Sequence, residues 1–348
     1  MNRIFIGMLA FVPVALVSFL IGAPPISLFI LSALALVPLA KFIGDATEEL
    51  ASYTTPAIGG LVNATFGNAT ELLIGLFALS AGLGEVVKGA LTGAIIGNLL
   101  LVLGTAMLVG GRKRVSQKFN PTIARAAGSM LILATIGLVI PAMFLATSGA
   151  AGAGLVQNLS VLVSILMICA YGASLFFSLH THKHLFQAEA ALIKPKWSVR
   201  KSIGILFGAV VGAAAMSEVL VSAITPLVTV FGWSQLFIGV VVVAIVGNVA
   251  EHFSAVVAAH KDRMDLSFQI AIGSATQIVM FVAPVLVLLS LFMPHRMDLV
   301  FNTFELVAII FSVFVANAVL NDGESNWLEG VQLLIAYIIM AIAFFLHP

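Results

Sequence analysis

Two short segments of this chain share a pattern that could do chemistry, Gly-Asn-x-x-Glu, and each ends in a glutamate inside a long apolar run. They are Gly67-Asn68-Ala69-Thr70-Glu71 and Gly247-Asn248-Val249-Ala250-Glu251. A carboxylate inside an apolar spanning segment is costly, so a functional role is the first hypothesis for Glu71 and Glu251. The alternative is a structural residue that is hydrogen-bonded or paired with Arg or Lys, but neither motif has a basic neighbour on its own run.

The spacing of the motif predicts a set of oxygen ligands. On a helix, the asparagine three residues before each glutamate lies on the same face. The glycine four residues before it permits close helix approach, or a break that frees backbone carbonyls. Two carboxylates, two amide oxygens and carbonyls suit a hard divalent cation, and Ca²⁺ tolerates flexible geometry better than Mg²⁺. The sequence therefore predicts a Ca²⁺ site formed by both motifs, with Gly67, Asn68, Glu71, Gly247, Asn248 and Glu251.

The same two carboxylates predict the counter-substrate. Buried near each other without a cation, Glu71 and Glu251 would bind protons more readily. Protons and Ca²⁺ would then compete for one pair of groups, as an exchanger requires. We expect a Ca²⁺/H⁺ antiporter whose substrates are Ca²⁺ and H⁺ and which uses no cofactor. A Na⁺/Ca²⁺ exchanger is the main alternative, and a cation channel is a less favoured one.

The composition defines the class of protein around these motifs. Of 348 residues, 61% are hydrophobic and 9% charged, and mean hydropathy is +1.15. Soluble domains carry roughly 25% charged residues, so a water-soluble enzyme or a disordered chain is excluded. A net charge of +1 offers no footprint for nucleic acid, and the single Cys169 cannot form an internal disulfide. The sequence lacks Gly-x-Ser-x-Gly and His-Glu-x-x-His, so we do not expect an enzyme. The chain is expected to be a polytopic membrane protein in a lipid bilayer.

Eleven apolar runs are long enough, at about 20 residues, to span a bilayer as helices. Their continuous apolarity favours a helical bundle over a barrel. We expect them at 4–21, 26–44, 56–80, 86–110, 120–146, 154–179, 200–229, 234–259, 266–292, 300–320 and 327–346, with the second able to extend toward Tyr53.

The distribution of Lys and Arg predicts orientation. Loops on one side hold Arg3, Arg112, Lys113, Arg114, Lys118, Lys183, Lys194, Lys196, Arg200, Lys201, Lys261 and Arg263, while the other side holds Lys88 and Arg296. The positive-inside rule then places the N-terminus in the cytoplasm, and an odd number of spans places the C-terminus outside. Because no targeting extension is evident, we expect a prokaryotic plasma membrane.

An internal repeat relates the two motifs. An offset of 180 residues places Gly67, Asn68 and Glu71 on identical residues and Gly93 on Gly273. The motifs lie five spans apart, so the two copies cross the membrane in opposite directions, as in many secondary transporters. We expect an all-α fold with 1–25 as an N-terminal helix, 26–180 and 200–348 as inverted five-helix repeats, and 181–199 as a cytoplasmic linker.

A second layer of polar groups is expected around the site. Its members are Asn98, Ser274, Gln277, Glu218, Glu48 and His252. Asn98, Ser274 and Gln277 either ligate or relay protons, or form interhelical hydrogen bonds. The acids either collect cations or lie at wetted helix ends, and His252 either tunes Glu251 or faces another helix.

Two further features receive weaker interpretations. Glu305, near the start of its span, is expected at the membrane interface. The alternating histidines 180, 182 and 184 could bind a transition metal or sense pH, but their basic loop favours a solvated cluster.

The motifs resemble those of a known family. The segments 60–71 and 247–252 are similar to the two signature repeats of the cation/proton exchangers, the Ca²⁺/H⁺ antiporter branch of the calcium/cation antiporter superfamily. The segments 97–104, 273–277, 281–284 and 321–327 support this resemblance. It implies eleven helices, a cytoplasmic N-terminus and a cation site built on Glu71 and Glu251. The sodium-coupled relatives carry Ser/Thr-rich, Pro-Glu motifs instead.

One departure concerns regulation. Eukaryotic members of that family often carry a strongly acidic helix between the repeats, whereas 181–199 has a single acidic residue, Glu189. We therefore expect no regulation by an acidic helix. A homo-oligomer, the proton stoichiometry, and selectivity among Ca²⁺, Mn²⁺ and Cd²⁺ stay open.

Overall fold

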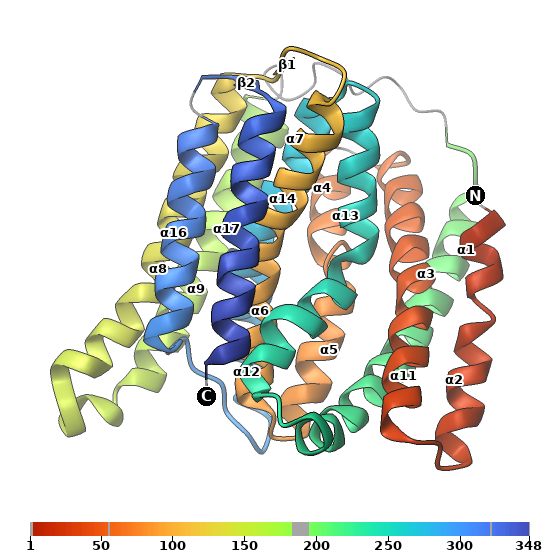
Figure 1. Cartoon of the computed structure of the whole chain (residues 1–348), viewed down its shortest axis with the longest axis vertical. Helices are drawn as coiled ribbons and strands as arrows, with labels where there is room; N and C mark the ends of the chain where they lie inside the picture. The colour runs from red at the N-terminus through yellow and green to blue at the C-terminus, as the bar shows by residue number, and fades with distance from the viewer. Residues whose placement is uncertain (1–2, 55, 183–194, 321, 348) are drawn as a thin grey trace. The chain divides into compact units, whose positions relative to one another are not determined.

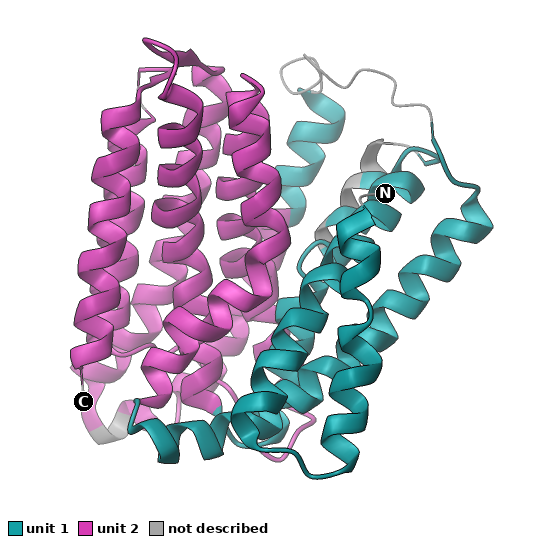
Figure 2. Ribbon diagram, turned by 45° about the vertical axis from the view of Figure 1, so that its right-hand side comes forward, with its two compact units in different colours: residues 1–83, 172–233 teal, residues 84–171, 234–348 magenta. Residues whose placement is uncertain are grey.

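The computed structural model describes residues 3–54, 56–182, 195–320 and 322–347, which are helical through most of their length. The chain forms two compact units (Figure 2). Unit 1 contains residues 1–83 and 172–233, and unit 2 contains residues 84–171 and 234–348. Each unit is therefore built from both halves of the chain.

Unit 1 contains seven elements and the end of an eighth among the described residues (Figure 1). They are α1 (Arg3–Met8), α2 (Phe11–Leu20), α3 (Pro25–Ala51), α4 (Pro56–Phe66), α5 (Ala69–Ser80), the π-helical η2 (Phe177–Thr181) and α11 (Val199–Phe231), with the end of α9 (Val156–Phe176). The long helices α3 and α11 pack along each other, and α5 packs against α11.

Unit 2 holds the remaining described elements. They are α6 (Gly84–Ile96), the π-helical η1 (Gly97–Val102), α7 (Leu103–Gly111), β1 (Gln117–Lys118), α8 (Pro121–Ala153), most of α9, α12 (Gln235–Phe237), the π-helical η3 (Ile238–Val243), α13 (Ala244–His260), α14 (Met264–Gln277), the π-helical η4 (Ile278–Val282), α15 (Ala283–Ser290), α16 (Thr303–Val319), β2 (Glu324–Ser325) and α17 (Trp327–Leu346).

The predicted all-helical architecture is confirmed, but the predicted span 56–80 is divided into α4 and α5. Within the described residues, nine helices are long and apolar enough to cross a membrane, and Ala69–Ser80 and Thr303–Val319 are shorter apolar helices. The first span, Arg3–Leu20, is interrupted between α1 and α2. Pro13 explains the interruption, because it has no N–H to donate to the carbonyl of Leu9. The second span continues to Ala51, within the extension toward Tyr53 that the sequence allowed.

The inverted repeat appears in how helices pair. Helices related by the 180-residue offset pack against each other: α3 with α11, α6 with α14, and α8 with α16. The π-helical turns η1 and η4 also occupy equivalent positions in the two copies. The fold class predicted from the sequence is therefore the one observed.

The two copies differ at the motif itself. The chain breaks between α4 and α5, where a Cβ added to Gly67 would lie 2.6 Å from the carbonyl oxygen of Asn63. The equivalent Gly247 and Asn248 lie inside the continuous helix α13. Of the two roles expected for the motif glycine, a helix break is thus seen at Gly67 and not at Gly247.

Helix α6 of unit 2 crosses η3 so closely that their backbones are in contact. A Cβ added to Gly93 would lie 1.9 Å from the carbonyl oxygen of Val240, and one added to Gly239 would lie 2.6 Å from that of Val86. Glycine at these positions is therefore a packing requirement. The crossing fixes α6 against the span that continues into α13.

Three loops predicted to be cytoplasmic meet at one end of unit 2. The short strands β1 and β2 pair antiparallel, with Gln117 opposite Ser325. Gln117 donates to a carboxylate oxygen of Asp262 at 2.8 Å, and Arg114 pairs with the same carboxylate at 3.2 Å. These contacts place the α7–α8, α13–α14 and α16–α17 loops at the same end, as the predicted order of crossings requires.

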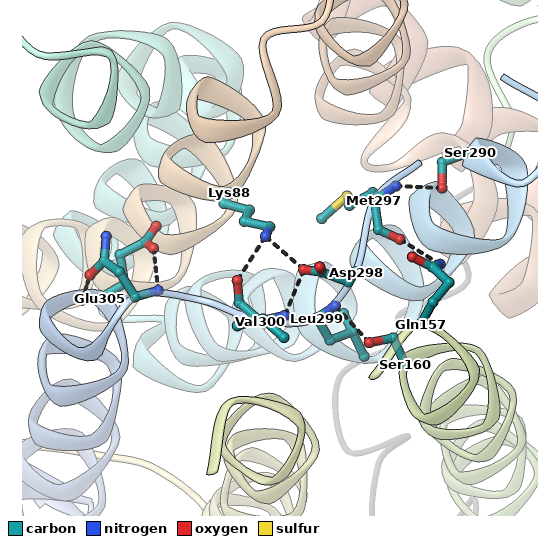
Figure 3. A network of polar contacts seen from close by, with 10 residues as sticks. Lys88, Gln157, Ser160, Ser290, Met297, Asp298, Leu299, Val300 and Glu305 are labelled. Carbon is teal, nitrogen blue, oxygen red and sulfur yellow. Dashed lines mark hydrogen bonds and ion pairs between the residues drawn. The ribbon is translucent and has the colours of Figure 1, made fainter. Parts of the chain in front are cut away.

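At the other end of unit 2, side chains from three helices hold the loop between α15 and α16 (Figure 3). The bonds run from Gln157 to the carbonyl of Met297 at 3.1 Å, from Met297 N–H to Ser290 at 2.9 Å, from Leu299 N–H to Ser160 at 3.0 Å, and from the Lys88 ammonium to Asp298 and to the Val300 carbonyl, both at 2.7 Å. These hydrogen bonds fix the loop to the helices of unit 2.

Candidate functional site

Four polar residues from three helical segments converge inside unit 2. The side-chain amide of Asn98, in η1, donates to Oδ1 of Asn248 at 3.3 Å and to the Ser274 hydroxyl at 3.0 Å. Ser274 also forms a side-chain hydrogen bond with Glu251. Asn98 and Asn248 are fully buried and Ser274 nearly so. We call these four residues the amide cluster.

Two side-chain oxygens of the amide cluster accept no hydrogen bond from the described residues. Oδ1 of Asn98 and Oε2 of Glu251 are buried, and neither has a hydrogen-bond partner within the described residues. Buried polar atoms are nearly always paired, so each exception needs an explanation. An acceptor oxygen that lacks a donor is suited to ligate a cation, and amide and carboxylate oxygens are the ligands that Ca²⁺ takes.

Local helix geometry aims these groups. Asn98 lies in a π-helical turn, a widened geometry that often marks functional positions in helices. Asn248 donates its own amide to the carbonyl of Ala244 one turn earlier at 3.0 Å, which fixes its side chain against α13. The donors of the cluster are thus used within the protein, and the unused atoms are oxygens.

The first motif lies in unit 1. Asn68 occupies the residue before α5 and is buried, and Glu71 lies in the first turn of α5, half-buried. Because α4 ends at Phe66, α5 has its own N-terminus in the middle of the predicted span. The positive end of the α5 dipole stabilises a carboxylate at that position.

Among the other predicted residues, Gln277 ends α14 and bonds the side chain of Tyr171. His252 is half-buried on α13, next to Glu251. Glu48 on α3 and Glu218 on α11 are both exposed on unit 1. The structure therefore brings Asn98 and Ser274 together with the second motif. Glu48 and Glu218 do not join this cluster and lie on α3 and α11 of unit 1.

Other acids near the end of α3 have structural partners. Lys41 pairs with Asp45 one turn away. The carboxylate of Glu49 accepts the backbone N–H of Lys196 at 2.8 Å and that of Trp197 at 3.1 Å, which ties the end of α3 to the segment before α11.

The histidine cluster lies partly outside the described residues. The rings of His180 and His182 stack on Phe176 and Phe177, respectively. His184 and residues 183–194 of the linker lie outside the part of the chain that the structure describes.

Two buried side-chain contacts were not predicted from the sequence. Tyr171 is buried and bonds Gln277. The chain has three tyrosines, and the presence of one in an apolar run is the sequence feature that could have indicated this contact. Glu305, expected at the interface, is 1% exposed and accepts a hydrogen bond from Thr92 at 3.0 Å. The pairing of two residues 213 positions apart leaves no mark in the local pattern.

No group of three or more His, Cys, Asp or Glu side chains gathers within the described residues. A metal site in this part of the chain would therefore be completed by amide, hydroxyl or carbonyl oxygens. This chemistry suits a hard cation that binds reversibly rather than a resident zinc or iron.

An inverted repeat of membrane helices, with interior carboxylates at matching positions of the two copies, defines a secondary transporter. The chain belongs to the sodium/calcium exchanger protein family, whose model matches residues 25–180 and 201–346.

Similar proteins cover the chain from end to end. It is 47% identical over 353 residues to a Ca²⁺/H⁺ antiporter, ChaA, of Bacillus subtilis (strain 168), covering 99% of this chain and 100% of that protein. It is 44% identical over 363 residues to a Ca²⁺/H⁺ antiporter of Aphanothece halophytica, covering 100% and 97%. The solved structure of native YfkE matches with a TM-score of 0.87 and 44% identity, over 99% of this chain and 100% of that one.

Proposed function

We propose that this protein is an antiporter that exchanges Ca²⁺ for H⁺ across a prokaryotic plasma membrane. The observation that carries the proposal is a pair of buried oxygens, one of Asn98 and one of Glu251, that have no hydrogen-bond partner among the described residues. They lie where the second motif meets η1 and α14. The similar proteins named Ca²⁺/H⁺ antiporters support the choice of substrates.

In this mechanism, Glu71 and Glu251 carry either Ca²⁺ or protons. Two carboxylates neutralise one Ca²⁺, and two protons neutralise the same pair. Either loaded form avoids an uncompensated charge in the low-dielectric interior, whereas the empty form would hold two negative charges. Only loaded forms change orientation readily, so the two substrates move in opposite directions. Asn68, Asn248, Asn98 and Ser274 complete or orient the ligand set, with carbonyls at Gly67 and Gly247 as further donors.

Sodium coupling is the alternative. A sodium–calcium exchanger, NCX_Mj, shares the fold with a TM-score of 0.58 at 18% identity, which concerns architecture alone. The relatives at 44–47% identity that span the whole chain are named for proton coupling. We therefore propose protons as the counter-ion, with the N-terminus and the meeting point of the three unit 2 loops on the cytoplasmic side.

The proposal is tested in proteoliposomes that contain a pH-sensitive dye and a Ca²⁺ indicator. Adding Ca²⁺ should drive proton movement without Na⁺, and Glu71→Gln and Glu251→Gln should abolish it. Glu324→Gln, which removes a carboxylate from the β2 loop, is the matched control and should transport normally. Ca²⁺ movement that requires Na⁺ would replace this proposal with the sodium-coupled one, and normal exchange by Glu251→Gln would refute the site.

A further inference from the structure

Unit 2 contains a second buried carboxylate that the proposed transport cycle does not use. Glu305 lies in the first turn of α16 and is 1% exposed. Its side chain and that of Asn302 form a capping box: Glu305 N–H donates to Asn302 at 2.8 Å, and Asn302 N–H donates to Oε2 of Glu305 at 3.0 Å. Capping boxes satisfy free N–H groups at helix ends and do not need burial.

A second capping box in the same unit shows what capping alone requires. Asn326 and Glu329 form it at the start of α17, with Asn326 N–H donating to Glu329 at 3.0 Å. Glu329 is half-buried there, whereas Glu305 is 1% exposed. Burying a carboxylate carries a desolvation cost of several kcal/mol, which its hydrogen bonds must offset. The burial of Glu305 therefore serves something beyond the cap.

The additional partner of Glu305 is on α6. The Thr92 hydroxyl, fully buried, donates to Oε1 of Glu305 at 3.0 Å. Both carboxylate oxygens are thus occupied, one by the cap and one by α6. Lys88 and Glu85, also on α6, are the charged neighbours of this carboxylate.

This contact belongs to a set that holds α6 in place. Lys88, one turn before Thr92, bonds Asp298 and the Val300 carbonyl in the loop that leads into α16 (Figure 3). Gly93, which directly follows Thr92 in α6, lies against the backbone of Val240. The segment 298–305 and η3 therefore fix the same part of α6. That helix continues into η1, where Asn98 lies six residues after Thr92.

We infer that Glu305 is a positioning residue for the cation site, acting through Thr92 to hold α6 and hence Asn98. The inference rests on the proposed function. Ligand oxygens must be held to within a fraction of an ångström, and partners behind the ligands of a metal site commonly change its affinity by about 10- to 100-fold. Loss of the Glu305–Thr92 bond should therefore weaken Ca²⁺ binding rather than simply lower the amount of folded protein.

The experiment measures Ca²⁺ flux into proteoliposomes for Thr92→Val, Glu305→Ala, the double variant and Glu305→Gln. Thr92→Val removes one hydroxyl at nearly constant volume. We expect Thr92→Val and Glu305→Ala each to raise the KM for Ca²⁺ by about tenfold, with no further rise in the double variant. Glu305→Gln keeps one oxygen for the Asn302 N–H and an NH2 group that can donate to the Thr92 hydroxyl, so it should restore a KM near that of the wild type.

Glu329→Ala is the matched control, because it removes the same kind of cap at the start of α17, a helix that packs mainly against α7. It should lower thermal stability and leave the KM unchanged. An unchanged KM in Thr92→Val, an equal rise in Glu329→Ala, or additive rises in the double variant would each overturn the inference. If Glu305→Ala does not fold, Thr92→Val and Glu305→Gln carry the comparison. The flux of Ca²⁺ is recorded independently of the counter-ion, so loss of proton coupling would refute the proposed exchange and leave the KM comparison valid.

Discussion

The side-chain amide of Asn98 lies 3.3 Å from Oδ1 of Asn248, a bond between residues 150 positions apart in the chain. It joins one repeat to the other inside a single compact unit, because η1 comes from the first half and α13 from the second. The second motif is therefore not an isolated helix segment. Its asparagine is held by a residue from the other repeat, and the amide oxygen of that residue has no hydrogen-bond partner in the part of the chain that the structure describes.

The first prediction concerns Asn98. Asn98→Ala removes the donor to Asn248 and Ser274 and also the unpaired oxygen, so we expect the KM for Ca²⁺ to rise by about 10- to 100-fold. The measurement is the initial rate of radioactive Ca²⁺ uptake into proteoliposomes across a range of Ca²⁺ concentrations. Asn317→Ala is the control, since Asn317 on α16 donates to the carbonyl of Val313 in its own helix. A KM for Asn98→Ala equal to that of the control would remove Asn98 from the site.

The second prediction concerns pH. If protons and Ca²⁺ compete for Glu71 and Glu251, lower pH on the Ca²⁺-loading side fills the site with protons. The apparent KM for Ca²⁺ should then rise as pH falls, by up to about 100-fold per pH unit where two protons are displaced, while the maximal rate changes little. The measurement is Ca²⁺ uptake at several pH values on the loading side, with the pH on the opposite side of the membrane held constant. A pH effect confined to the maximal rate would contradict competition.

The third prediction concerns the α6–η3 crossing. Gly93→Ala would place a methyl group 1.9 Å from the Val240 carbonyl oxygen, so the two backbones must separate. We expect a loss of stability of about 3 kcal/mol or more and impaired transport by the protein that still folds. Gly208→Ala provides the contrast: its Cβ would meet nothing within 4 Å, and alanine favours a helix over glycine. Thermal melting in detergent should show a lower melting temperature for the first variant and an equal or higher one for the second.

The fourth prediction concerns the loop contacts at Asp262. This residue adopts φ 63°, a left-handed conformation that Asn and Asp tolerate better than other non-glycine residues. Asp262→Ala loses both this tolerance and the bonds to Gln117 and Arg114, so we expect destabilisation by about 1–3 kcal/mol. Asp262→Asn keeps the backbone preference and an acceptor for Gln117.

The comparison at Asp262 separates backbone preference from charge. Exposed ion pairs contribute little, so Asp262→Asn should melt close to the wild type. Equal destabilisation by both variants would show that the charge pair with Arg114 outweighs the backbone term.

Much of the fold was predictable from local sequence. A bilayer requires each spanning segment to satisfy its own backbone hydrogen bonds within an apolar stretch, so hydropathy alone located the helices. The repeated Gly-Asn-x-x-Glu motif then predicted which helices are equivalent, and the packing of α3 with α11 and of α8 with α16 follows that equivalence. Interruptions inside a span were less predictable, as the break between α1 and α2 shows, because an apolar pattern does not mark where a helix is broken.

The sequence by itself determined that Glu71 and Glu251 lie within apolar spans, because a charge in an apolar run is visible without coordinates. Only the tertiary structure decided that Asn98 and Ser274 meet the second motif, that Gly67 breaks its helix while Gly247 does not, and that Glu305 is buried against Thr92. These relationships depend on which helix faces meet across long separations in the chain. The same apolar pattern permits many such pairings, so side-chain hydrogen bonding and backbone approach in the packed state decide among them.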